Sequence, residues 1–158
     1  MILDAQCTFS DAQALTATAL GTNVYDLGTA LSLGNGEPMG VHFTVDVAAD
    51  QTSGNEDYTF QVTYSSDAAQ TTALIAVGAV AFESGTPTAP ALDADLLVAG
   101  FQFVIPVPMT AQSMDGRYIG VRYLLAGTTP TITVSSYLGP LSLLSVAAPV
   151  YTSGFSIT

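Results

Sequence analysis

Apolar and polar residues alternate with a period of two along much of the chain. The alternation is clearest in residues 41–47, 58–65, 119–124 and 132–135, where aromatic and β-branched residues occupy every second position. Residues 100–105 repeat it more weakly. Such alternation is typical of β-strands with one buried and one solvated face. The pattern therefore predicts an antiparallel protein of about eight short strands separated by turns rich in glycine and proline.

Two alanine-rich segments do not follow this alternation. Residues 11–20 favour one or two turns of helix, because alanine is the strongest helix former, and the sequence Gly-Thr-Asn that follows limits them to that length. Residues 70–81 fit a helix or an extended strand equally well, because Ile75, Val77 and Val80 are β-branched. Helix is therefore expected to be a small part of the fold.

The predicted fold class is all-β, an antiparallel β-sandwich or jelly roll with little helix. In such a fold two sheets cover each other's apolar faces and leave their polar faces to solvent. The chain has 158 residues and contains neither an internal repeat nor a boundary between domains. We expect one domain over residues 1–158, with residues 1–20 as a candidate N-terminal arm. Residues 139–158 are expected to form a final strand or a C-terminal arm.

The charge balance excludes two classes of partner. The chain has 13 acidic residues, two arginines and no lysine, which gives a net charge of −11 at pH 7. Nucleic-acid binding needs cations that displace counterions from phosphates, and anionic membranes attract basic segments. We therefore expect no direct contact with nucleic acid or membrane. All acidic residues lie at or before Asp115 and both arginines lie after it, so the C-terminal segment is suited to contact an acidic face.

The residues needed for catalysis are scarce. Without lysine there is no Schiff-base chemistry, and the single cysteine, Cys7, and single histidine, His42, have no recognisable partners in the sequence. Cys7 is expected to be a small buried residue or a tolerated surface thiol. His42 falls on the polar side of its predicted strand, which indicates a surface or interface histidine. We expect no enzyme activity, no metal site and no cofactor.

Carboxylates cluster beside two predicted loops. Asp50, Glu56 and Asp57 flank one of them, and Asp93 and Asp95 follow a loop rich in proline. The simpler interpretation is that these carboxylates solvate loops and strand edges. The alternative is calcium binding, because carboxylates and loop carbonyls are suitable hard ligands, although Asp93-Ala-Asp95 alone is a weak signal.

The two arginines are the first candidates for an interface. Arg117 begins a predicted strand and Arg122 lies within it, opposite in phase to its apolar neighbours. In so acidic a chain both are expected to form bidentate pairs with carboxylates. Such pairs lie either within the chain or across a boundary between subunits.

The apolar ends of the chain supply the other interface candidates. Residues 139–158 carry no charge, and an uncharged apolar segment left exposed would form an adhesive patch. Tyr151, Phe155 and Ile157 are the candidates in this segment, and Ile2 and Leu3 are those at the start of the chain. They are expected to pack within the same sandwich or on a neighbouring subunit.

Several short segments, in order, resemble a known phage family. They include Met1-Ile-Leu-Asp-Ala-Gln6, Phe9-Ser-Asp-Ala-Gln13, Thr22-Asn-Val-Tyr-Asp-Leu-Gly28 and Arg117-Tyr-Ile-Gly-Val-Arg-Tyr123. Residues 62–67, 99–103, 106–108 and 126–128 continue the likeness. Together they resemble the jelly-roll cement, or decoration, proteins of tailed phages, of the Bordetella-phage structural type. The resemblance covers roughly residues 1–138 and rests on order and spacing.

The resemblance implies a structural role without catalytic residues. It implies a protein made in the host cytoplasm that joins the virion, binds the outer surface of an icosahedral capsid, contacts the major capsid protein and associates with itself as a dimer or trimer. The alternative function is a receptor- or carbohydrate-binding jelly-roll domain of a virion appendage. The start of the chain lacks a basic region followed by an apolar run, so no secretory signal is expected.

Overall fold

The computed structural model describes residues 5–28, 37–71, 74–107 and 116–142. The described elements are β-strands and two short 3-10 helices, and their bounds are given next. They are η1 (Ala5–Cys7), β1 (Thr8–Leu15), β2 (Ala19–Leu20), β3 (Tyr25–Asp26), β4 (Met39–Val47), β5 (Asp57–Ser65), β6 (Ile75–Glu83), β7 (Leu92–Asp93), η2 (Ala94–Leu96), β8 (Gln102–Pro106), β9 (Tyr118–Ala126) and β10 (Ile132–Pro140).

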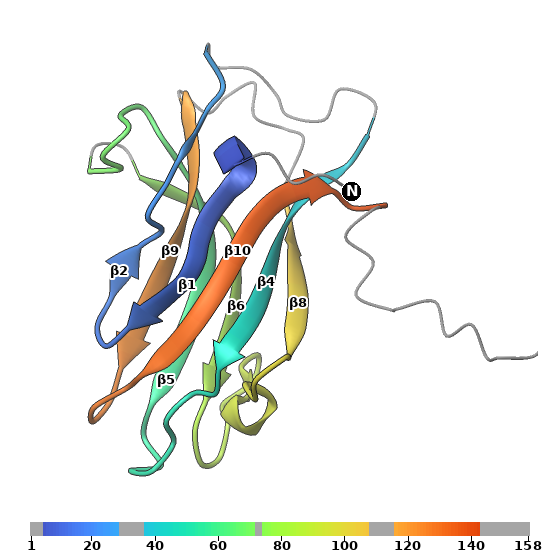
Figure 1. The fold of residues 1–158 in the computed structure, drawn as a ribbon. Coiled ribbons are helices and arrows are strands. Elements are labelled where there is room, and N and C mark those ends of the chain that lie inside the picture. Colours follow the sequence, from blue (N-terminus) through green and yellow to red (C-terminus); the bar gives the residue numbers. More distant parts are fainter. Residues whose placement is uncertain (1–4, 29–36, 72–73, 108–115, 143–158) are drawn as a thin grey trace, which may run out of the picture.

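The strands form two packed sheets (Figure 1). One sheet has the order β1-β10-β4-β8, and the other has the order β2-β9-β5-β6-β7, with β3 also paired to β9. All pairings are antiparallel except that of β6 with β7. The chain crosses repeatedly from one sheet to the other, and its first and last described long strands, β1 and β10, lie side by side. This arrangement confirms the predicted jelly-roll sandwich.

The inner faces of the sheets follow the predicted alternation. In β5 every second side chain from Tyr58 to Tyr64 is buried, and in β9 the same holds from Ile119 to Tyr123. In β4 the buried alternation runs from Val41 to Val45. Removing these apolar faces from water is the main favourable contribution to the stability of such a sandwich.

An aromatic cluster joins the two sheets at the centre of this core. The Phe60 ring lies at centroid distances of 5.6 Å from Phe43, 5.1 Å from Phe103, 5.8 Å from Phe82 and 5.8 Å from Tyr123. These four contacts are edge-to-face, an arrangement that aromatic pairs favour. Phe43 and Phe103 belong to the β4–β8 side, so Phe60 fixes one sheet against the other.

A polar contact deep in this core involves the Tyr123 hydroxyl. It lies 2.8 Å from the Ser10 hydroxyl and 2.9 Å from the Ser136 hydroxyl, both in the opposite sheet. Burial raises the pKa of Tyr123 to about 12, despite these two hydrogen bonds. Because buried polar groups must be paired, this contact aligns β9 with β1 and β10.

The expectation of helical turns in residues 11–20 is wrong. Residues 8–15 form β1, which pairs with β10 from Thr8 opposite Tyr137 to Leu15 opposite Ile132. The strand is irregular, with register shifts and a left-handed φ of 43° at Ala12, whose N–H donates to Ser135 Oγ. Pairing with a distant strand therefore overrides the helix preference of alanine. Much of the candidate arm, residues 1–20, is thus part of the sheets.

Of the two alternatives predicted for the second alanine-rich segment, residues 70–81, the extended strand is the one observed. Residues 75–83 form β6, an inner strand of the second sheet that pairs with β5 and β7. At the other end of the chain, residues 139 and 140 complete β10. Residues 143–158 lie outside the described residues. For them, the choice between a final strand and a C-terminal arm stays a prediction.

Val47 departs from the alternation of its own strand. The sequence places it in phase with the buried residues of β4, yet its side chain is 59% exposed. The cause is a register shift: Val134 pairs with Val45, but Thr133 pairs with Val47, so one extra residue is accommodated in β4. A bulge of one residue turns the following side chain to the opposite face, and Val47 therefore points outward.

Candidate interaction surfaces

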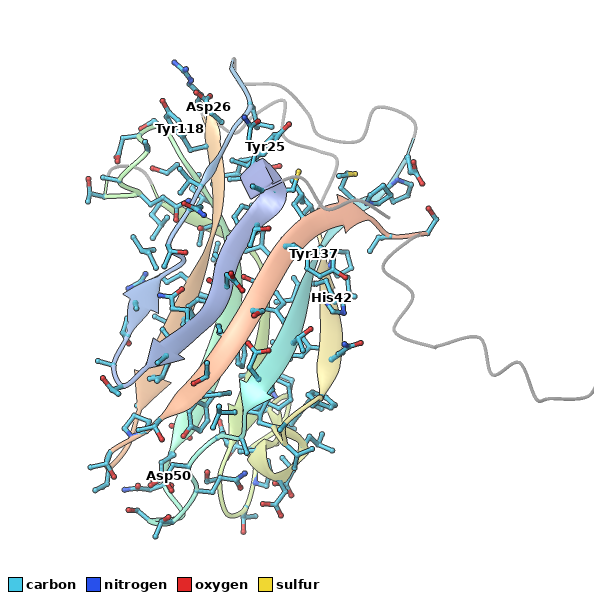
Figure 2. The ribbon with its side chains drawn as sticks, viewed as in Figure 1. Tyr25, Asp26, His42, Asp50, Tyr118 and Tyr137 are labelled. Carbon is cyan, nitrogen blue, oxygen red and sulfur yellow. The ribbon has the colours of Figure 1, made fainter. Side chains whose placement is uncertain are left out.

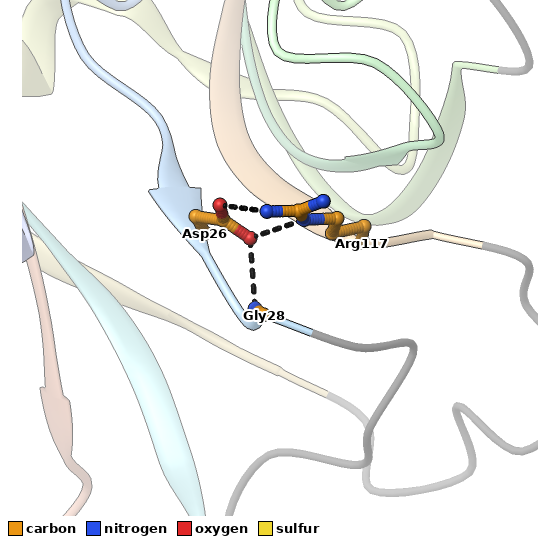
Figure 3. Close-up of polar contacts among 3 residues, drawn as sticks. All are labelled: Asp26, Gly28 and Arg117. Carbon is orange, nitrogen blue, oxygen red and sulfur yellow. Dashed lines mark hydrogen bonds and ion pairs between the residues drawn. The ribbon is translucent and has the colours of Figure 1, made fainter.

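Arg117 forms a bidentate ion pair with Asp26 near one end of the sandwich (Figure 3). Arg117 Nε donates to Asp26 Oδ1 at 2.7 Å, and Nη2 donates to Oδ2 at 2.6 Å. The Gly28 N–H also donates to Asp26 Oδ1 at 2.7 Å. The pKa of Asp26 is lowered by the Arg117 hydrogen bond and by that of Gly28, and the pKa of Arg117 is raised by Asp26. For Arg117, the pair within the chain is therefore observed.

This ion pair fixes β3 against the start of β9. The Leu27 N–H donates to the Arg117 carbonyl at 2.9 Å, and the guanidinium carbon lies 5.2 Å from the centre of the Tyr118 ring. The Arg117 and Asp26 side chains are 48% and 43% exposed. Since exposed ion pairs are screened by solvent, this one orients the segment more than it stabilises the fold.

Arg122 has a different environment on the outer face of the second sheet. It lies opposite Leu20 of β2 and Gln61 of β5, and no carboxylate among the described residues pairs with it. It borders a hollow of about 560 Å³. The other residues that line this hollow are Thr18, Ala19, Leu20, Gln70, Thr71 and Leu74. The expectation of an Arg122–carboxylate pair is therefore not met within the described part of the chain, and a pair across a subunit boundary stays a prediction.

The expectation that the loop carboxylates are solvated is wrong for Glu56. Its side chain is fully buried, and it accepts hydrogen bonds from the N–H groups of Ser53 and Asn55, both at 3.1 Å. Burial alone would raise the pKa of Glu56, but backbone hydrogen bonds from its own N–H, Ser53 and Asn55 outweigh it and lower the pKa. Glu56 thus closes the 51–56 turn from inside, and nothing in the sequence separates it from its solvated neighbours.

Several of the other carboxylates form a row at the same end of the sandwich. Asp57 in β5 pairs with Glu83 in β6, which in turn pairs with Asp93 in β7. Burial raises the pKa of Asp57, and the negative charges of Glu83 and Glu56 raise it further. Among the described residues no cation pairs with this row, so like charges face one another across three adjacent strands.

The described residues contain no cluster of side chains that would support the calcium alternative. Asp93 Oδ1 accepts the Asp95 N–H at 2.9 Å and thereby caps the short helix η2. In residues 5–28, 37–71, 74–107 and 116–142, no three His, Cys, Asp or Glu side chains come together as a metal site would require. Asp93 therefore has a local structural role in the described fold.

His42 lies on the outer face of its sheet, as its phase predicted, but it is only 5% exposed. Its ring centre is 4.6 Å from that of Tyr137 on β10, to which it is directly paired (Figure 2). Burial lowers the pKa of His42, and a hydrogen bond with Gln102 on β8 partly opposes that shift. The surface alternative is thus wrong for the described fold, since neighbouring strands cover the ring, and the interface alternative stays a prediction.

Acidification is expected to destabilise the fold through His42. Its pKa is lower in the folded than in the unfolded state, so its contribution is complete above the unfolded value of 6.5 and is lost as the pH falls toward the folded value. Thermal unfolding of wild type and His42→Gln, measured between about pH 7 and pH 5, should show a larger fall in Tm for wild type. Equal falls in Tm would contradict this assignment, since all other titrating groups are shared by the two proteins.

The remaining sequence candidates lie outside the described residues. These are Ile2, Leu3, Tyr151, Phe155 and Ile157. The interface role predicted for them stays a prediction. Cys7, by contrast, is described: it is half-buried and packs against the hydrophobic core.

Sequence reasoning missed a group of exposed apolar side chains around η2. Leu92, Leu96 and Val98 are each exposed, and Val47 is exposed nearby. The signal present in the sequence is the segment Leu92-Asp-Ala-Asp-Leu-Leu-Val98, in which apolar residues and carboxylates are mixed without a period of two. That pattern fits neither a sandwich strand nor an ordinary solvated loop.

Comparison with known proteins gives one family. The model of the Bbp16 family, a family of Bordetella phage proteins, matches residues 9–137. This range contains almost all of the sandwich, from the second residue of β1 to the sixth residue of β10. No curated protein matches the chain. Within the described residues, no helix is long and apolar enough to cross a membrane.

Proposed function

Because the chain belongs to the Bbp16 family of Bordetella phage proteins, we propose that it is a structural protein of a phage particle. More specifically, it acts as a cement protein that oligomerises on the outer surface of an icosahedral shell and stabilises contacts between major capsid subunits. Family membership is the observation that carries the proposal. Its partners are then the major capsid protein and further copies of itself, and its role is binding and not catalysis.

The architecture suits a protein that must withstand mechanical force. A jelly roll whose two sheets are joined by an aromatic cluster resists shear between its layers, because interdigitated side chains are packed as densely as a crystal. A small rigid domain that contacts two or more shell subunits makes each further contact intramolecular. Individually modest contacts then add up to a stable link between capsomers.

The charge of the chain supports the outer surface over the inner one. Packed DNA fills the interior of a phage shell with negative charge. A protein with a net charge of −11 would be repelled from that lining, whereas the outer surface imposes no such penalty.

Addition of the purified protein to shells that lack it should stabilise them. The shells are assembled from the major capsid protein of the same phage, and binding is measured by co-sedimentation. We expect saturable binding and a temperature of shell disruption that rises with the amount bound, because a ligand of the assembled state stabilises that state.

Two results would reject the cement role. One is the absence of binding, and the other is a cryo-electron microscopy map of the decorated shell with this protein on the inner surface. An acidic protein of similar size and charge, tested in parallel, shows whether any stabilisation is specific.

A further inference from the structure

Exposed apolar side chains gather at one end of the sandwich. Five large apolar side chains of the described residues are exposed, and four of them lie where β4 ends and around η2: Val47 (59%), Val98 (55%), Leu92 (45%) and Leu96 (43%). We call these four residues the apolar end patch. The fifth, Ile75 (42%), begins β6 at the opposite end from Leu92, which pairs with Phe82. Exposed apolar side chains gathered in one place are typical of interaction sites.

The backbone holds the apolar end patch in place. The Ala49 N–H donates to the Leu97 carbonyl at 3.0 Å, and the Gly100 N–H donates to the Val45 carbonyl at 2.7 Å. These bonds tie the 97–100 loop to the end of β4, on either side of Val47. Figure 1 shows the coil of η2 next to this end of β4.

Buried residues within the loop determine which side chains point outward. Ala94 and Leu97 are fully buried, and the Leu97 N–H donates to the Ala94 carbonyl at 2.9 Å. Because Leu97 is anchored in the core, its neighbours Leu96 and Val98 are directed to solvent. Gln51 Nε2 donates to the Ala94 carbonyl and ties the turn to the 51–56 loop. A surface fixed in advance in this way loses little conformational entropy on binding.

Carboxylates that have no cationic partner among the described residues border the apolar end patch. Asp93 and Asp95 alternate with its residues in sequence and are exposed, as is Asp46, which directly precedes Val47. Asp50 lies at this end as well, whereas Asp26, the partner of Arg117, lies at the other (Figure 2). The chain has no lysine. Of its two arginines, Arg117 is paired with Asp26 at the other end, and Arg122 borders the hollow on the outer face of the second sheet.

The charge decides which partner fits. A second copy docked through the same end would bring its carboxylates against those of the first, and like charges across an interface oppose binding. DNA is excluded for the same reason. A protein surface with apolar side chains bordered by lysine or arginine complements both features.

We propose that the apolar end patch is the surface through which this protein docks on the shell, against an apolar area of the major capsid protein bordered by basic residues. The inference rests on the proposed function and adds the contact surface and the chemistry of the partner. Contacts of the buried apolar centre provide most of the binding energy, and the carboxylate border provides orientation.

Two substitutions in the patch and one matched control test the inference. Val98→Asp and Leu96→Asp should each weaken binding to the shells described above by about tenfold or more, because a charge placed in a desolvated contact is unfavourable. The control Ile75→Asp replaces an apolar side chain as exposed as that of Leu96 but outside the patch, and its affinity should stay within about twofold of wild type. Circular dichroism and thermal unfolding verify that all three variants fold.

Charge reversal tests the border separately. Asp95→Lys should weaken binding several-fold, whereas Asp11→Lys, at an exposed position of β1, should leave it nearly unchanged. The loss caused by Asp95→Lys should diminish in high salt, since salt screens exposed charges.

The possible outcomes separate this inference from the cement role. If wild type binds the shells and both patch variants bind equally well, the docking surface is wrong and the cement role stands. If wild type does not bind, both fall. If Val98→Asp instead dissociates an oligomer of wild type in analytical ultracentrifugation, the patch is a contact between copies and the inference is overturned.

Discussion

Phe60→Ala is expected to lower the free energy of unfolding by about 3–5 kcal/mol. The Phe60 side chain is 2% exposed and contacts four aromatic rings drawn from both sheets. Its removal withdraws a large apolar surface from the core and leaves a cavity that rigid strands cannot close. Since domains of this size are stable by about 5–15 kcal/mol in total, the variant should be close to the limit of folding.

Denaturant unfolding in urea measures this effect. The midpoint should fall while the slope with denaturant stays the same, which identifies a change in stability and not in compactness. Phe60→Leu keeps most of the buried volume and should lose clearly less. A loss below about 1 kcal/mol for the alanine variant would mean that the sheets are not held together by this cluster.

Gly127→Ala is expected to be the most damaging single-methyl change in the described turns, with a loss of about 3 kcal/mol or more. Gly127 has a φ of +96°, which residues with a side chain rarely adopt. A Cβ at this position would also lie 2.2 Å from the Asn55 carbonyl oxygen and 2.8 Å from Glu56 Cα. Because those atoms belong to backbone, the turn between β9 and β10 must move away from the loop that buries Glu56.

A second glycine separates the two causes. Gly100 has a similar φ of +86°, but a Cβ there would meet no atom within 4 Å. Gly100→Ala should therefore show only the backbone penalty, about 1–2 kcal/mol. Equal losses for the two variants, measured by thermal or urea unfolding, would contradict the close approach of Gly127 to the 55–56 backbone.

The sequence predicted the strands where the alternation was long and regular. The segments around β4, β5, β9 and β10 were correctly placed, because one buried and one solvated face impose a period of two on each strand. It failed in β1, where a bulged strand is stabilised by its pairing with β10 and not by its own composition. Pairing between residues more than a hundred positions apart leaves no local signal in such a segment.

Side-chain environments were less predictable than strands. Arg117 was expected to find a carboxylate, and it does, because an acidic chain offers many partners. Glu56 was expected in solvent and His42 at the surface or at an interface. Both are buried in the described fold, since backbone N–H donors enclose the first and neighbouring strands cover the second. Both environments depend on residues brought together by the fold.

The sequence by itself determined the all-β class, the main strands, the strong negative charge and the membership of a phage protein family. These properties are local or additive, so each can be read from composition, period or the order of short segments. The tertiary structure alone decided that Val47 turns outward at a bulge. It also decided that Leu97 is anchored in the core while its neighbours Leu96 and Val98 stay exposed. Register and loop anchoring depend on contacts between distant strands, and for that reason the apolar end patch becomes visible only in the folded molecule.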